Sequence, residues 1–141
     1  MFGISQDFKR IRVSLVSMKS VFVAGSRRKS YRKINDLVQL LNDSGISATT
    51  AGKSEDVCND TKESEQNSLL NAFRKIDESD VCYVFSTDGY IGRTVSVEIA
   101  YAHAKEKELI SSEKLGIIST SVPISKVMNS EELIKYCSSS E

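Results

Sequence analysis

Short apolar runs alternate with amphipathic helical patterns through most of this 141-residue chain. The run Val21–Ala24 is uninterrupted and predicts a buried strand. Residues 31–42 carry apolar side chains at helical spacing and stop near Gly45, so they predict a helix. Residues 46–50 then predict a second strand. The apolar positions of the helix are Ile34, Leu37, Val38 and Leu41.

The same alternation continues in the second half of the chain. Residues 51–63 are polar and have no clear period, which predicts a long loop of the kind that often serves as a lid. A second helix follows, closed by Asp80, and the apolar run 81–85 then predicts a central third strand. A helix that carries Glu98 and a short strand at 109–111 come next. The apolar face of the second helix consists of Leu69, Leu70, Phe73 and Ile76.

Both ends of the chain have ambiguous patterns. The first eighteen residues suit a strand by their alternation and a helix by the spacing of Phe8, Ile11 and Leu15, so both remain open. Residues 115–122 predict one or two strands around Gly116. Residues 130–136 begin with a serine and two acidic residues, which predicts a capped terminal helix.

This order of strands and helices predicts an α/β protein with one domain. Strands that alternate with helices form parallel sheets covered on both faces, with right-handed crossovers. We therefore expect a three-layer Rossmann/flavodoxin-like fold with a mainly parallel sheet of four to five strands. The pattern begins at Lys19, so we divide the chain into an extension at 1–18, the domain at 19–137 and a tail at 138–141.

The segment 89–104 carries the chemistry that the sequence predicts. It follows the third strand, contains two glycines, and leads into a nearly apolar helix that we expect to be buried on most sides. Glu98 is the only acid in that helix, and we expect it in the first turn. Ligands of open α/β sheets bind at the carboxyl ends of the strands, so Asp88, Gly92, Arg93 and Glu98 are expected to line one pocket. The alternative is that Glu98 only complements the helix dipole.

Composition narrows the class of partner. Lysine plus arginine and aspartate plus glutamate number 19 each, which gives no general attraction to nucleic acid or to a membrane. Cys58, Cys82 and Cys137 are widely spaced and odd in number, so they indicate neither a disulfide framework nor a metal site, and a reducing cytoplasm fits best. No apolar run is long enough to cross a membrane.

The loop and helix around Glu98 resemble a known family. Gly92, Thr94 and Ser96, leading into the run 98–102 and followed by Lys107, are similar to the signature of the nucleoside 2-deoxyribosyltransferases. The first strand and its loop are similar as well. The run Gly25-Ser26-Arg27-Arg28 resembles the phosphate-holding loop of the related deoxynucleoside 5'-monophosphate N-glycosidases. The resemblance covers roughly residues 19 to 112.

The resemblance implies a reaction at the N-glycosidic bond of a deoxynucleoside or its 5'-monophosphate. Glu98 would attack the sugar and form a glycosyl-enzyme, which water or a second base resolves. No cofactor is implied, the substrate is a nucleoside or nucleotide, and relatives often complete their pockets with a neighbouring subunit, which implies a homo-oligomer. The implied substrate-binding residues are Gly25, Ser26, Arg27, Asp88, Gly92, Arg93 and Ser96.

Two positions depart from the family pattern. Ala72 stands where relatives usually carry an aspartate, and Phe22 stands where they commonly carry a tyrosine that bonds the nucleophile. An acid from the polar loop, for instance Asp60, Glu63 or Glu65, is one replacement for the missing aspartate. The other interpretation is a non-catalytic nucleotide-binding module on the same fold. A phosphoribohydrolase is disfavoured because no Pro-Gly-Gly run precedes the helix.

Overall fold

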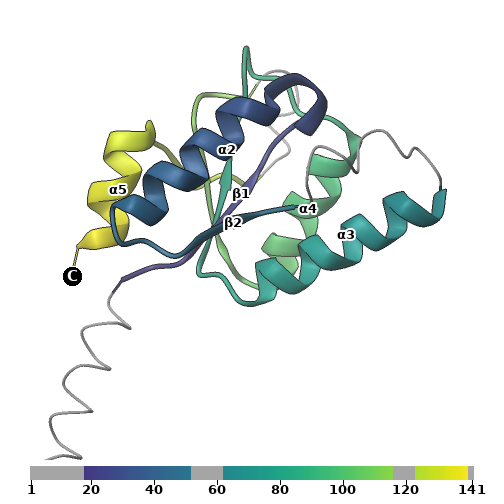
Figure 1. Ribbon diagram of the computed structural model, residues 1–141, viewed down its shortest axis with the longest axis horizontal. Helices are drawn as coiled ribbons and strands as arrows, with labels where there is room; N and C mark the ends of the chain where they lie inside the picture. The colour runs from purple at the N-terminus through teal and green to yellow at the C-terminus, as the bar shows by residue number, and fades with distance from the viewer. Residues whose placement is uncertain (1–17, 52–61, 116–122, 140–141) are drawn as a thin grey trace, which may run out of the picture.

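The computed structural model describes residues 18–51, 62–115 and 123–139 (Figure 1). Within these ranges five strands and four helices follow one another along the chain. Their bounds are β1 Val21–Ala24, α2 Arg27–Asp43, β2 Ala48–Thr50, α3 Lys62–Asp77, β3 Val81–Val84, α4 Arg93–Ala104, β4 Glu108–Ser111, β5 Lys126–Val127 and α5 Ser130–Ser138.

The five strands form one parallel sheet in the order β2-β1-β3-β4-β5. Val21 of β1 is in register with Ala48 of β2 on one side and with Val81 of β3 on the other. This is the flavodoxin-like order, in which the connection direction reverses between β1 and β3. The predicted α/β fold, with its parallel sheet of four to five strands, is confirmed.

Side chains of successive strand residues point to opposite faces of the sheet and build two separate cores. Phe22 and Cys82 belong to the core under α3 and α4, here called the α3/α4 core. Val23 and Tyr83 belong to the core under α2 and α5, the α2/α5 core. Figure 1 shows the two helix pairs on either side of the strands. The strands are apolar throughout because both of their faces are covered.

Several boundaries differ from the predicted ones. Helix α2 includes a short first turn that was not predicted, capped by the Ser26 side chain, which accepts a hydrogen bond from the Lys29 N–H. A kink at Ser30, whose φ of −131° and ψ of 23° are not helical, separates this turn from the helix predicted from residue 31. Strand β5 was not predicted, and the predicted strand at 115–122 lies outside the described residues except for Leu115. The terminal helix is confirmed, with Asn129 and Glu132 forming a capping box. The extension at 1–17 and the loop at 52–61 also lie outside the described residues.

The starts of β1 and β3 are joined by a reciprocal set of hydrogen bonds. The backbone N–H of Ser20 donates to the Asp80 carboxylate at 2.9 Å, and the Asp80 N–H donates to the Ser20 carbonyl at 3.0 Å. The Ser20 hydroxyl also bonds the Asp80 carboxylate at 3.2 Å. These bonds fix the register of the two central strands at their amino ends. Asp80 was expected to close the second helix, but α3 already ends at Asp77 and Asp80 lies just before β3. No helix among the described residues is both long enough and apolar enough to cross a membrane.

Candidate functional site

Glu98 lies in the second turn of α4, so the prediction that it occupies the first turn is wrong. The helix begins at Arg93 after an N-cap at Gly92, which supplies no side-chain cap, and its first turn contains no acid. A dipole effect confined to the first turn therefore does not explain Glu98. Its side chain is only 3% exposed. The helix itself is buried on one side only, because Val97 is 39% exposed and Ala100 and Ala104 are exposed as well.

A buried thiol lies near the Glu98 carboxylate. Cys82 of β3 lies close enough for its thiol to interact with the charge of Glu98. Burial raises the pKa of the Cys82 thiol far above its ordinary value, and the negative charge of Glu98 raises it further. Cys82 therefore remains a neutral thiol beside the carboxylate and does not serve as a thiolate nucleophile.

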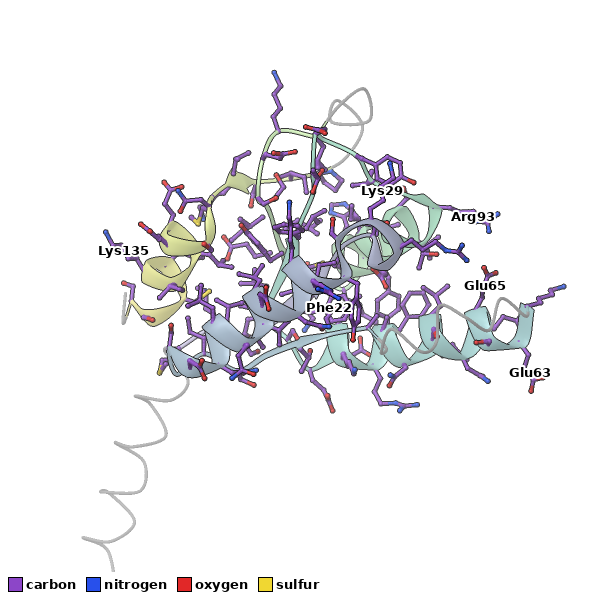
Figure 2. The ribbon with its side chains drawn as sticks, turned by 45° about the horizontal axis from the view of Figure 1, so that its top comes forward. Phe22, Lys29, Glu63, Glu65, Arg93 and Lys135 are labelled. Atoms are coloured by element: carbon purple, nitrogen blue, oxygen red, sulfur yellow. The ribbon has the colours of Figure 1, made fainter. Side chains whose placement is uncertain are left out.

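The two residues that depart from the family pattern share this face of the sheet. Phe22 is in register with Cys82 on the neighbouring strand, and both are fully buried in the α3/α4 core. Ala72 of α3 is also fully buried there, and α3 packs against α4. Figure 2 shows Phe22 in the interior of the molecule. Phe22 and Ala72 therefore both lie in the α3/α4 core, which Glu98 faces. Neither side chain has a polar group.

The loops after β1 and β3 approach each other closely at Gly25. A Cβ atom on Gly25 would lie 2.7 Å from Ile34 Cδ1 and 2.9 Å from the carbonyl oxygen of Phe85. The Phe85 N–H donates to the Ala24 carbonyl at 2.7 Å, which continues the β1–β3 ladder into these loops. The two loops can therefore approach this closely only because residue 25 has no side chain.

The start of α2 presents basic residues beside these loops. Ser26 is the N-cap, so its hydroxyl is already bonded within the helix. The Arg27 side chain lies outside the described part of the structure, and the Arg28 side chain is exposed. Lys29 places its ammonium 4.0 Å from the centre of the Tyr90 ring, a cation–π contact between α2 and the loop after β3. Lys29 and Arg93 lie at the same end of the molecule in Figure 2.

The loop from β3 to α4 is held in shape by hydrogen bonds. Asp88 and Gly89 both have left-handed backbones, with φ of 60° and 73°. The Gly89 N–H donates to the Glu113 carboxylate at 2.6 Å, and the Ser86 hydroxyl donates to the Tyr90 carbonyl at 2.9 Å. Sequence reasoning missed Glu113, although its place just after β4, at the carboxyl edge of the sheet, is a usable signal.

Ser96 and Arg93 take different positions in α4. The Ser96 hydroxyl donates to the Gly92 carbonyl at 2.9 Å, so it is engaged within the first turn of the helix. Arg93 is exposed at the helix start. Gly92 has room for a Cβ except toward the Tyr90 hydroxyl, at 3.3 Å.

A cleft of about 580 Å³ opens at the carboxyl edge of the sheet, between α2 and the start of α5. Its lining includes Asp88, Glu113 and Lys33, together with the α2/α5 core residue Tyr83. Glu98 does not line this cleft, and it faces the opposite side of the sheet. The single pocket that we expected Asp88, Gly92, Arg93 and Glu98 to line stays a prediction. In the described ranges, no group of three or more His, Cys, Asp or Glu side chains is placed to hold a metal ion.

No protein-family model matches the sequence, and no curated protein matches it. Solved structures with similar folds include the following three. A 2-deoxyribosyltransferase from Bacillus psychrosaccharolyticus has a TM-score of 0.61 and 15% identity, covering 83% of this chain and 91% of that chain. The CMP N-glycosidase BcmB from Clostridium botulinum has a TM-score of 0.51 and 18% identity, covering 83% and 95%. The protein BlsM has a TM-score of 0.60 and 13% identity, covering 86% and 91%.

Because the sequence identities are this low, the comparisons show that the proteins share a fold and nothing more. The fold that the sequence resemblance implied is confirmed. It is the α/β fold of proteins that act on N-glycosidic bonds of nucleosides and nucleotides.

Proposed function

We propose that this protein cleaves or transfers the N-glycosidic bond of a deoxynucleoside or a deoxynucleoside 5'-monophosphate, with Glu98 as the nucleophile. The observation that carries the proposal is the burial of this carboxylate on α4, directly after the central strand of the sheet. A charged group is costly to bury, so a carboxylate held in an apolar core is a candidate for function. The shared fold with a 2-deoxyribosyltransferase and a CMP N-glycosidase supports the reaction class.

The proposed chemistry is a displacement at C1' of the sugar. A Glu98 oxygen bonds to C1' while the C1'–N bond breaks, through an oxocarbenium-like transition state, and the electron pair of that bond leaves with the base. Water or an incoming base then attacks C1' and releases Glu98. The departing base needs a proton, and Ala72 supplies none. We therefore expect turnover slower by about 10²–10⁴-fold than with a general acid in place.

The start of α2 is the proposed site for a 5'-phosphate. The first backbone N–H groups of a helix favour anions, and the basic residues Arg27, Arg28 and Lys29 follow the Ser26 cap. Charged hydrogen bonds contribute about 1.5–3 kcal/mol. Monophosphates should therefore bind more tightly than the corresponding nucleosides.

The test is turnover of a panel of deoxynucleosides and their monophosphates, with and without an acceptor base, followed by chromatography of the released bases. Glu98→Gln should lose nearly all turnover and still bind ligand, because the amide keeps the shape of the acid but attacks poorly. Glu106→Gln is the matched control, since Glu106 is an exposed acid just after the same helix. Wild-type turnover that Glu98→Gln leaves intact would refute the proposed mechanism. Equal affinity for nucleosides and monophosphates would reject the phosphate site.

A second candidate function is nucleotide binding without catalysis. The full burial of Ala72 and Phe22 favours it, because neither position gives Glu98 a hydrogen-bonding partner. This candidate predicts tight binding of a nucleotide, measured by calorimetry, with no base released from any member of the panel. Turnover that depends on Glu98 would exclude it.

A further inference from the structure

The cleft at the carboxyl edge of the sheet lies away from Glu98. It opens on the face that α2 and α5 cover, and Figure 1 shows these two helices on the same side of the strands. Its volume of about 580 Å³ falls among the sites that bind small organic molecules, which measure about 300–1,000 Å³. The side chains that line the cleft indicate which class of molecule it takes.

The deepest part of the lining is apolar and aromatic. Leu37 of α2 and Tyr83 of β3 are buried, and Phe85, just after β3, is half-buried. Leu40 lines the cleft one turn after Leu37 and is 44% exposed. These side chains offer a surface for the hydrocarbon part of a ligand, because covering them removes apolar area from water.

The charged groups of the lining are mainly acidic. Asp36 of α2, Asp88 after β3 and Glu113 after β4 line the cleft, and Lys33 is the one cation among the described lining residues. Three carboxylates and one ammonium give this lining a formal net charge of −2. Glu113 accepts the Gly89 N–H, whereas Asp36 and Asp88 form no ion pair with any residue that the structure describes. Two carboxylates are therefore available to a ligand.

Tyr83 adds a buried hydrogen-bond acceptor to the lining. Its hydroxyl donates to the Met128 carbonyl at 2.7 Å, and the residue is only 1% exposed. A phenol oxygen can also accept, and none of the described residues donates to this one. Burial raises the pKa of Tyr83, and the charge of Glu132 raises it further, so the phenol stays neutral. The lining therefore favours a ligand that is rich in donors.

An organic cation fits this lining better than a metal ion does. In the described ranges, no three His, Cys, Asp or Glu side chains are grouped to hold a metal. The carboxylates come from three separate elements, and the same cleft presents apolar side chains. An aliphatic amine matches both features, because its ammonium groups donate hydrogen bonds and its methylene groups pack on apolar surface. A net charge of −2 is matched by two ammonium groups.

We propose that this cleft binds an aliphatic amine that carries two or more ammonium groups. One ammonium donates to Asp36 and another to Asp88, while the methylene chain lies on Leu37 and Phe85. Lys33 weakens the attraction, since it repels both ammonium groups. The site does not include Glu98, so the inference stands apart from the proposed N-glycosidic chemistry.

The test is isothermal titration calorimetry of the full chain with putrescine and with spermidine, at constant ionic strength. We expect both amines to bind, and added salt to weaken the binding by screening the exposed charges. Butylamine has one ammonium and should bind at least about threefold more weakly than putrescine. Butanediol has a chain of the same length without charge and should give no heat of binding. No binding of either polyamine at millimolar concentration would overturn the proposal.

Substitutions in the lining locate the binding. Asp36→Asn and Asp88→Asn should each weaken putrescine binding by about 2- to 10-fold, because each removes a charged acceptor. Asparagine tolerates the left-handed backbone of Asp88, so the loop keeps its shape. Lys33→Gln should tighten binding by about 1.5- to 3-fold. Asp43→Asn is the matched control, an exposed acid of α2 outside the cleft, and Glu98→Gln should bind putrescine as the wild type does.

The signs of these effects make the site falsifiable. Circular dichroism shows that each variant is folded. Putrescine binding that neither Asp36→Asn nor Asp88→Asn weakens, or that Lys33→Gln weakens, would overturn the proposed site. Displacement of putrescine by magnesium chloride, beyond that caused by sodium chloride at the same ionic strength, would assign the cleft to a metal ion instead. Loss of nucleoside turnover has no bearing on this result, because amine binding is measured directly.

Discussion

Replacing Gly25 with alanine tests how closely the loops after β1 and β3 approach. The added methyl would lie 2.7 Å from Ile34 Cδ1, which can rotate away, and 2.9 Å from the Phe85 carbonyl oxygen, which cannot. The carbonyl contact falls about 0.5 Å short of the 3.4 Å at which ordinary contact begins. Since β1 and β3 are hydrogen-bonded next to this point, relief requires the two strands to separate locally.

The expected cost follows from two opposing effects. Overpacking of a well-packed site costs about 1–3 kcal/mol. Replacing glycine restricts the unfolded chain and recovers about 0.4–1 kcal/mol. The free energy of unfolding should therefore fall by about 1–2 kcal/mol, which lowers the melting temperature of a chain of this length by about 3–8 °C.

The assay is urea unfolding followed by circular dichroism, with Ile34→Val as a second substitution. Removing Cδ1 relieves one of the two contacts, so Gly25→Ala should cost at least about 0.5 kcal/mol less in the Ile34→Val background. Gly45→Ala is the control, because a Cβ at Gly45 would make only an ordinary contact, 3.8 Å from Met18 Cε, so that only its φ of 86° opposes alanine. Its cost of about 1 kcal/mol should be the same in both backgrounds. A Gly25→Ala variant as stable as the wild type would refute the close approach of the loops.

Two further predictions concern a polar cluster and a buried thiol. The Tyr136 hydroxyl donates to both Glu108 oxygens, at 2.7 and 2.6 Å, so Tyr136→Phe should cost about 1–2 kcal/mol in urea unfolding. Burial raises the pKa of Glu108, but hydrogen bonds from Lys126 and Tyr136 outweigh it and hold the pKa below the ordinary 4.5. The stabilisation should therefore be present above that pH and disappear as the pH falls below it, and an equal cost at every pH would contradict the assignment. Cys82, buried beside Glu98, should resist iodoacetamide in the native protein, and rapid labelling seen by mass spectrometry would show that it is accessible.

The fold could be predicted because its central strands are buried on both faces. The runs at β1 and β3 are uninterrupted and apolar, so their positions follow directly from the sequence. Strand β5 has no such signal, since Lys126 and Val127 are both exposed at the edge of the sheet. The short turn of α2 before the kink at Ser30 was missed because it is basic, and only the Ser26 cap indicates it.

The candidate site was predictable in composition but not in geometry. Glu98 interrupts an apolar helix, which made its importance visible, and its burial agrees with that interpretation. Its turn was misjudged because Gly92 gives no side-chain cap that marks the helix start. The side of the sheet that Asp88 reaches depends on a left-handed backbone at Asp88 itself and on the Gly89–Glu113 hydrogen bond. The hydrogen bond between Gly89 and Glu113 joins residues far apart in the sequence, so no local pattern contains it.

The hydrogen bonds between Ser20 and Asp80 have a consequence for engineering. They align β1 and β3 at the amino ends of these strands, whereas the loops that carry Gly25 and Asp88 leave from the carboxyl ends. The residues that align the strands and the loops that carry the candidate site thus lie at opposite ends of β1 and β3. New loops grafted after β3 should therefore leave the strand alignment intact, which makes this small domain a suitable scaffold for libraries with altered ligand preference.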